Sequence, residues 1–456
     1  MSTQRSTSGA APAATGAQPA VGRATRFSYG SLTIDEAAGV LTCHYDLDGH
    51  QFAEVIEVGA GHEWTPAARE AARLVHLLAG VSYYKAGAPP ELDLGKTVVR
   101  PGEREFLRRF YIDGLGEFAF RNGLSLEDLE IAGGLEEEGP VEAATDADRA
   151  LVPFGGGIDS IVTVETVKAA YPDAALFVVN PLGVPRFAAI ERAAAATGLP
   201  VVRAERRVDK QGLSSLRRAY NGHVPVTGIL SAIAVLCAVL SSRGRVVMSN
   251  EWSASQGNLL DNGRVVNHQW SKSAAFEQAF RAVLAGALGS AVDYFSFLRP
   301  WSELWVARRF ATMECYHPVV HSCNRAFHLD PAERLDHWCG RCDKCCFIDL
   351  VLSPFMSRAA LARIFGGAEP LDNPDLLGRF RALLGLGDAY KPFECVGDTG
   401  ECRAAATLAA GRADRAGNPV LAALLAELPG PVGTEGLFQP VGDHAVPHAL
   451  FAAAFH

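Results

Sequence analysis

The stretch Gly155-Gly156-Gly157-Ile158-Asp159-Ser160 has the residue types of a phosphate-binding turn. Three consecutive glycines let backbone N–H groups approach an anion closely. We expect a helix to open at Asp159 and Ser160, so the positive end of its dipole would face the same anion. The loop lacks the Gly-Lys-Ser/Thr ending of a Walker A motif and the spaced glycines of a dinucleotide fingerprint. The plain alternative is a strand-to-helix turn without a ligand.

A group of cysteines has the spacing of a metal site. Cys323 is followed by Cys339-x-x-Cys342-x-x-Cys345. Four thiolates can close a tetrahedral Zn²⁺ site that leaves no open position for catalysis, and the metal would fix a loop of low apolar content. Cys346 is harder to place as the fourth ligand. An iron–sulfur cluster is the alternative occupant, and disulfides are less expected inside a cell.

Polar side chains also follow predicted strands. Asn180 follows an apolar run at 174–179, and Asn250 follows another at 245–249. The carboxyl ends of parallel strands face the ligand crevice of an α/β sheet. Residues 265–273 are dense in hydrogen-bonding side chains that a core would not satisfy, which favours a substrate-facing role. The candidates in this segment are Asn267, His268 and Lys272.

Basic residues form two further features. A cluster between Arg203 and Arg218 could bind a phosphorylated substrate or could be a solvated helix face, and it contains Arg206, Arg207 and Arg217. The run Val81-Ser82-Tyr83-Tyr84-Lys85 sets two aromatic residues beside a cation at a helix end. We interpret this run as packing plus a solvated lysine.

The elements that must position these residues predict an α/β protein. Strand 151–154, the glycine loop, a helix to residue 168 and strand 174–179 form a β-loop-α-β unit, which favours a parallel, helix-covered sheet. We therefore expect a doubly wound parallel sheet over residues 150–355. Before it we expect a disordered tail at 1–25 and an N-terminal α+β domain at 26–142. Residues 356–456 are Ala- and Leu-rich at helical spacing and predict a C-terminal helical region.

Composition limits the function classes. The 456-residue chain is 48% hydrophobic and carries a net charge of -9, which argues against a nucleic-acid partner. We find neither a membrane-spanning run nor a signal peptide, so we expect a cytoplasmic protein. The ten cysteines favour a metal or free thiols over disulfides in that compartment. The oligomeric state is left open.

The motifs together resemble known families. The glycine loop resembles the SGGxDS pyrophosphate loop of the ATP pyrophosphatases (HUP-like fold), with Gly155 in place of the usual Ser. With the cysteines, residues 151 to about 355 resemble the cyano-deazaguanine synthases, which adenylate a carboxylate and carry a four-cysteine zinc site. Over the whole chain, segments 77–85, 152–160 and 391–397 look more like the MurL-type UDP-N-acetylmuramoyl-L-alanyl-L-glutamate epimerases.

The resemblance implies an ATP-dependent epimerase of peptidoglycan biosynthesis. It would invert the terminal L-Glu of UDP-N-acetylmuramoyl-L-alanyl-L-glutamate to D-Glu through an acyl-adenylate, releasing AMP and pyrophosphate. Residues 155–157, Ser160 and Asn180 would bind ATP, and Asp159 would help to place Mg²⁺. The basic cluster, Asn250 and Asn267 would bind substrate. Adenylation would make the Cα–H removable by removing the carboxylate charge.

The proton-abstracting base stays open. His268, Lys272, His223 and Cys395 all have suitable chemistry, and two bases would serve the two faces of the carbon. Cys395 could instead be structural together with Cys402. The rival functions are another carboxylate-adenylating synthase or ligase, a tRNA-thiolating enzyme, which the acidic balance disfavours, and a nucleotide-sensing module without turnover.

Overall fold

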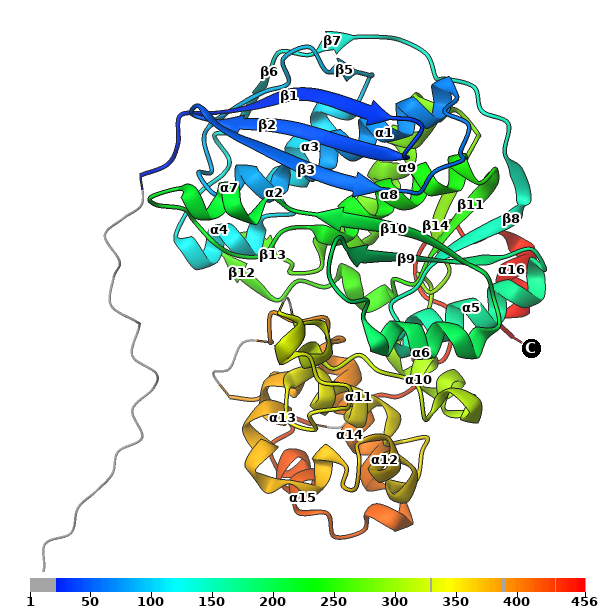
Figure 1. Ribbon diagram of the computed structural model, residues 1–456. Helices are drawn as coiled ribbons and strands as arrows, with labels where there is room; N and C mark the ends of the chain where they lie inside the picture. Colours follow the sequence, from blue (N-terminus) through cyan, green and yellow to red (C-terminus); the bar gives the residue numbers. More distant parts are fainter. Residues whose placement is uncertain (1–21, 329, 388–390, 431, 456) are drawn as a thin grey trace, which may run out of the picture.

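The computed structural model describes residues 22–328, 330–387, 391–430 and 432–455. Most of the tail expected at 1–25 lies outside these residues. Figure 1 shows a large sheet flanked by helices, with a group of helices below it. The strands are β1 (Arg26–Asp35), β2 (Val40–Leu47), β3 (His50–Glu57), β4 (Glu91–Asp93), β5 (Val98–Val99), β6 (Glu130–Ala132), β7 (Leu135–Glu136), β8 (Asp146–Pro153), β9 (Ala175–Pro181), β10 (Val201–Arg207), β11 (Arg243–Met248), β12 (Leu259–Asp261), β13 (Arg264–Val266) and β14 (Asp293–Ser296).

The α-helices separate into those around the sheet and those of the C-terminal part. Around the sheet lie α1 (Pro66–Ala79), α2 (Val81–Tyr84), α3 (Glu103–Ile112), α4 (Gly116–Asn122), α5 (Ile158–Ala170), α6 (Ala188–Thr197), α7 (Lys210–Ser215), α8 (Val226–Leu240) and α9 (Ala274–Leu288). After them come α10 (Glu303–Ala311), α11 (Asp343–Leu352), α12 (Arg358–Ile364), α13 (Leu377–Leu384), α14 (Thr399–Ala410), α15 (Pro419–Ala426) and α16 (His448–Ala453). None of the described helices is long and apolar enough to cross a membrane.

The main sheet has ten strands in the order β14-β11-β8-β9-β10-β3-β2-β1-β4-β6. Its first five strands are mutually parallel, so their carboxyl ends share one edge. β3 then pairs antiparallel with β10, with Ile56 opposite Arg206, and β1–β3 form an antiparallel meander. The expected parallel α/β sheet is thus confirmed, and it continues unbroken into the N-terminal strands. Its assignment to the ATP pyrophosphatase type and the domain boundaries stay predictions.

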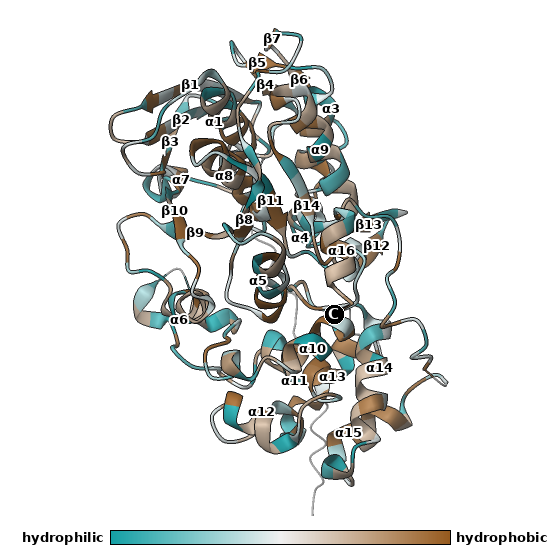
Figure 2. Cartoon of the chain, turned by 90° about the vertical axis from the view of Figure 1, so that its right-hand side faces the viewer, coloured by the Kyte–Doolittle hydropathy of each residue, from teal (hydrophilic) through white to brown (hydrophobic). Residues whose placement is uncertain are grey.

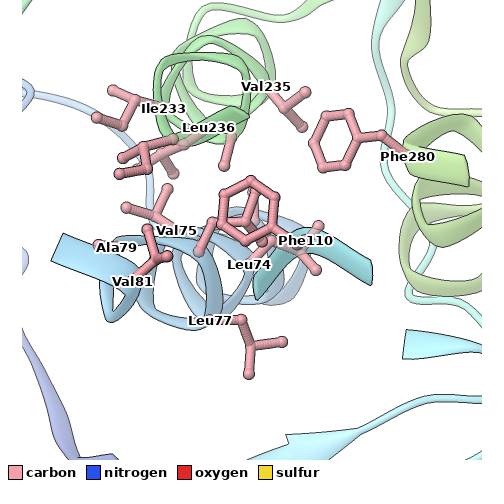
Figure 3. Packing of buried hydrophobic residues seen from close by; sticks show 14 of the residues in the cluster. Leu74, Val75, Leu77, Ala79, Val81, Phe110, Ile233, Val235, Leu236 and Phe280 are labelled. Carbon is pink, nitrogen blue, oxygen red and sulfur yellow. The ribbon is translucent and has the colours of Figure 1, made fainter. Parts of the chain in front are cut away.

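Alternate residues of the central strand β8 enter two different cores. Leu151 packs in one cluster with α1, α8 and α9, whereas Ala150 and Val152 pack in the other with α5. This alternation follows from the two-residue side-chain period of a strand covered on both faces. Figure 3 shows the first core, where Leu74 and Val75 of α1 face Ile233 and Leu236 of α8. In Figure 2, α8 is brown along its length, as expected for a helix buried on all sides.

Residues 103–122 form two helices, α3 and α4, in place of one continuous helix. The break falls at Gly114, where a Cβ atom would lie 2.2 Å from the carbonyl oxygen of Phe110 and 2.8 Å from the ring of Pro225. The close approach of Pro225 requires glycine at this point. As a result, α4 takes its own direction, and it carries Glu117 toward the site described below.

Candidate active site

The glycine loop joins β8 to α5 at the carboxyl edge of the sheet. Gly156 has a φ of +77°, and a Cβ there would lie 3.4 Å from both Ala193 and Ile190 of α6, so the turn favours glycine. No side chain caps the N-terminus of α5, which leaves its first N–H groups available to an anion. The hydroxyl of Ser160 donates to the carbonyl of Gly157 at 3.0 Å and stiffens the turn. The loop therefore has the backbone geometry of an anion site.

Asp159 occupies the first turn of α5 and faces other ionisable groups. Its Oδ1 atom is enclosed and has no hydrogen-bond partner among the described residues. Burial, and then the nearby charge of Glu251, raise the pKa of Asp159 to about 7, while Lys344 and Lys272 act in the opposite direction. An enclosed carboxylate oxygen beside a phosphate-type loop is a suitable ligand for a divalent cation.

Asn180, near the end of β9, is one of the residues that line a large cavity. Its side chain is 1% exposed, and neither its amide oxygen nor its amide nitrogen has a partner among the described residues. The cavity has a volume of about 790 Å³ and is lined by the ends of β9 and β10, by part of β3 and by the start of α7. An enclosed amide with an unpaired donor and acceptor at the wall of a cavity is a candidate contact for a polar group of a ligand.

Cys395 lies on the segment before α14 and is held by two lysines. The ammonium of Lys272 lies 3.1 Å from its Sγ atom, and the ammonium of Lys344 donates to its carbonyl oxygen at 2.6 Å. Asn258 fixes the same segment by donating to the carbonyl of Pro392 at 2.9 Å. Burial alone would raise the pKa of Cys395, but the charge of Lys272 and a hydrogen bond with His268 lower it to about 6. At neutral pH the side chain is therefore a thiolate.

His268 connects this thiolate to the N-terminal part of the chain. Its Nδ1 atom forms a hydrogen bond and an ion pair with Glu117 of α4. Although burial lowers the pKa of His268, its hydrogen bonds with Cys395 and Glu117 prevail and raise it to about 9. His223 packs on His268 with a ring-centroid distance of 4.2 Å, and burial and the charge of His268 lower its pKa to about 4. Cys395, His268 and Glu117 thus form a thiolate–imidazolium–carboxylate chain.

Glu117, His223 and His268 also offer one ligand atom each within 4.8 Å of one another, a spacing compatible with a metal ion. The Nδ1 atom of His268 is already bonded to Glu117. Glu117 and His268 are thus joined by a hydrogen bond, and His223 adds a ring contact to His268.

The four cysteines expected at a metal site converge. The Sγ atoms of Cys323, Cys339, Cys342 and Cys345 all lie within 4.8 Å of one another, with separations of 3.4, 3.7 and 3.9 Å for three of the pairs. In a regular tetrahedron of Zn–S bonds the sulfurs would lie about 3.8 Å apart, so the group fits Zn²⁺. Cys346 is fully buried in the core on α11. Lys344 links the four-cysteine group to Cys395, because it lies between Cys342 and Cys345 in the chain and its ammonium donates to the carbonyl of Cys395.

Two other predicted site residues form hydrogen bonds with other residues of the protein. Arg206 donates to Glu54 at 2.7 Å and to Ser82 at 2.9 Å, which commits its guanidinium to β3 and α2. The side-chain amide of Asn267 donates to Ala254 at 3.0 Å and accepts from the backbone of Gln269 at 2.8 Å.

Three further predicted residues lie at the sheet edge or the surface. The backbone of Asn250 is bound to Ser296 of β14. Arg207 is exposed at the cavity of Asn180, and Arg217 is exposed on the segment after α7.

The pH dependence of Cys395 alkylation provides a test of this electrostatic arrangement. The rate of reaction with iodoacetamide, followed by peptide mass spectrometry in a Cys315→Ala background, should rise with pH around 6 because the thiolate forms there. Lys272→Met should move that midpoint upward, since the largest stabilising charge is lost. A wild-type midpoint near that of an ordinary thiol would contradict the arrangement.

Comparisons with known proteins agree on one family. Residues 19–297 match the family description MurL N-terminal domain, and residues 319–436 match MurL C-terminal domain. Three curated relatives are named UDP-N-acetyl-alpha-D-muramoyl-L-alanyl-L-glutamate epimerase. The relative from Xanthomonas oryzae pv. oryzae is 38% identical over 444 residues, which cover 93% of this chain and 96% of the relative. The relative from Salinispora tropica is 40% identical over 442 residues, which cover 93% of this chain and 94% of the relative. The relative from a Micromonospora species is 41% identical over 444 residues, which cover 93% of this chain and 96% of the relative. The chain therefore belongs to the MurL family.

Proposed function

We propose that this protein inverts the terminal L-Glu of UDP-N-acetylmuramoyl-L-alanyl-L-glutamate to D-Glu through an acyl-adenylate made from ATP. One observation carries the proposal beyond the names of the relatives. A glycine loop with a free helix N-terminus lies within electrostatic reach of a buried thiolate, since the pKa of Asp159 responds first to burial and Glu251 and then to Lys344, Lys272 and Cys395. This proximity supports a proposal in which phosphate chemistry and proton abstraction share one site.

In the proposed first step, the glutamate carboxylate attacks the α-phosphorus of ATP, and pyrophosphate leaves. The N–H groups at the start of α5 would receive the pyrophosphate, and the amide of Asn180 would bind the adenine edge in its cavity. Asp159 would hold Mg²⁺, which supplies positive charge to the leaving phosphates. The resulting acyl-adenylate has no carboxylate charge, so a carbanion at Cα can delocalise into its carbonyl.

In the second step, the Cys395 thiolate takes the Cα proton. Lys272 and His268 keep the sulfur ionised, and Glu117 fixes the ring of His268. Inversion also needs a proton donor on the opposite face of the bound glutamate. Water then attacks the carbonyl carbon, releasing AMP and the D-Glu product.

The test is an assay of purified protein with ATP, Mg²⁺ and the L-Glu substrate. Pyrophosphate release and the chirality of glutamate after acid hydrolysis are both followed. D-Glu that appears only with ATP, in step with pyrophosphate, is the expected result. Pyrophosphate without inversion would instead favour another carboxylate-adenylating synthase or ligase, and inversion without ATP would refute the adenylate.

We further propose that the four cysteines hold one structural Zn²⁺, which would cross-link Cys323 to the start of α11. Metal analysis of the purified protein should give about one zinc per chain, consistent with a closed site of four thiolates. Cys342→Ser should lose most of this zinc and lower the melting temperature, because the loop has little apolar content to hold it. Cys315→Ala, at an exposed cysteine, is the matched control. An iron–sulfur absorption spectrum would contradict the assignment to zinc.

A further inference from the structure

Lys85 is not the solvated lysine that its sequence context suggests. It directly follows α2 and is partly buried against residues 221–223. Its ammonium donates to the carbonyl oxygen of Gly222 at 2.8 Å and approaches the side-chain oxygen of Asn221 at 3.4 Å. Both acceptors are neutral, and among the described residues no charged group contributes to the pKa shift of Lys85. Burial also lowers the pKa of Lys85.

Lys85 lies close enough to the histidine cluster to act on it electrostatically. Its charge, after burial and His268, contributes to lowering the pKa of the adjacent His223. Glu117 is the carboxylate at this cluster, and it is already bound by His268 and by Arg121, which donates to it at 2.6 Å. A partly buried ammonium with only neutral acceptors is costly unless an anion completes its environment. The structure therefore provides a cation that is bonded to Gly222, the chain neighbour of His223, and that has no protein counter-ion among the described residues.

We propose that Lys85 binds the side-chain carboxylate of the substrate's terminal glutamate and selects glutamate over glutamine. This inference rests on the proposed function, since it names the group that holds the non-reacting carboxylate.

Distance favours the carboxylate over the substrate's diphosphate. Lys85 donates to Gly222, the chain neighbour of His223, His223 packs on His268, and His268 interacts with Cys395. The side-chain carboxylate of a glutamate whose Cα is at Cys395 is separated from that Cα by two methylene groups only. The diphosphate lies beyond the alanine and the sugar. A single ammonium also suits one carboxylate, whereas diphosphates are typically bound by several donors or by the planar fork of arginine.

The test compares two substrates that differ in this group, ending in L-Glu or in L-Gln, with wild type and Lys85→Met. Substrate binding without ATP is measured by calorimetry, and kcat/KM is measured with ATP. Wild type should prefer the L-Glu substrate, and Lys85→Met should weaken its binding by about 10- to 100-fold, as expected for losing a hydrogen bond between charged groups. Binding of the L-Gln substrate should change by less than about threefold, because a neutral amide gains little from the ammonium. Lys85→Arg should restore part of the preference, and Lys96→Met, at an exposed lysine of the turn after β4, should change neither substrate.

Each other result has a distinct meaning. Equal losses for both substrates would overturn the inference and make Lys85 a structural residue. A loss that persists with L-Gln but vanishes when the substrate lacks its UDP group would overturn it in favour of the diphosphate. An absence of inversion in wild type would refute the proposed function. The role of Lys85 would still be decided by the preference for L-Glu over L-Gln, because binding is measured without turnover.

Discussion

Cys395→Ala is expected to abolish inversion while pyrophosphate release on adding ATP and the L-Glu substrate persists. Alanine removes the sulfur that takes the Cα proton, and loss of a positioned base costs about 10²- to 10⁴-fold in rate. Adenylation uses the glycine loop and Asp159, so it should continue at a rate comparable to wild type. The second readout is exchange of the Cα hydrogen in D₂O, which should disappear with the inversion.

The matched control for this prediction is Cys315→Ala, because Cys315 is exposed and outside the site. It should retain both activities. A Cys395→Ala protein that still inverts glutamate and exchanges the Cα hydrogen at near wild-type rates would exclude the thiolate as the base. Loss of inversion with loss of pyrophosphate release would place Cys395 in adenylation or in the structure of the segment instead.

Asp159→Asn should reduce pyrophosphate release and inversion together. The amide keeps the size of the side chain but removes the charge that would hold Mg²⁺ at the leaving pyrophosphate, and losing such electrostatic stabilisation costs about 10²- to 10³-fold. Asp173→Asn, at an exposed residue after the same helix, is the control and should leave both rates unchanged. Selective loss of inversion in Asp159→Asn would contradict a role in the first step and would suggest proton transfer instead.

The parts of the site that could be predicted from the sequence are those encoded over short distances. The glycine loop and its helix span a few residues, so the turn and its position at a strand end follow from local pattern. Three of the four cysteines stand within seven residues, and the zinc-like spacing brings Cys323 to them. Asn180 was predictable because parallel strands place their carboxyl ends at one edge.

Contacts between distant segments could not be predicted in this way. Lys272 and Cys395 were each chemically suitable, but their contact joins segments 123 positions apart in the chain. The sequence did not indicate a role for Glu117 in the site, because a carboxylate on an amphipathic helix is typical of a solvent-exposed face. For Arg206, in contrast, the sequence suggested a binding role that its contacts do not support. It belonged to a basic cluster that suggested phosphate, but the pairing of β10 with β3 sets it against Glu54, a partner that the sequence alone does not reveal.

The measurement that tests the central claim most directly is the fate of the substrate's carboxylate oxygen. The terminal α-carboxylate is labelled with ¹⁸O, and AMP is analysed by mass spectrometry after turnover. If the carboxylate attacks the α-phosphorus and water then attacks the carbonyl carbon, each AMP retains one oxygen from the carboxylate, and D-Glu forms in equal amount. Formation of D-Glu with unlabelled AMP would contradict the proposed route, in which the carboxylate oxygen passes to phosphorus and water attacks the carbonyl carbon.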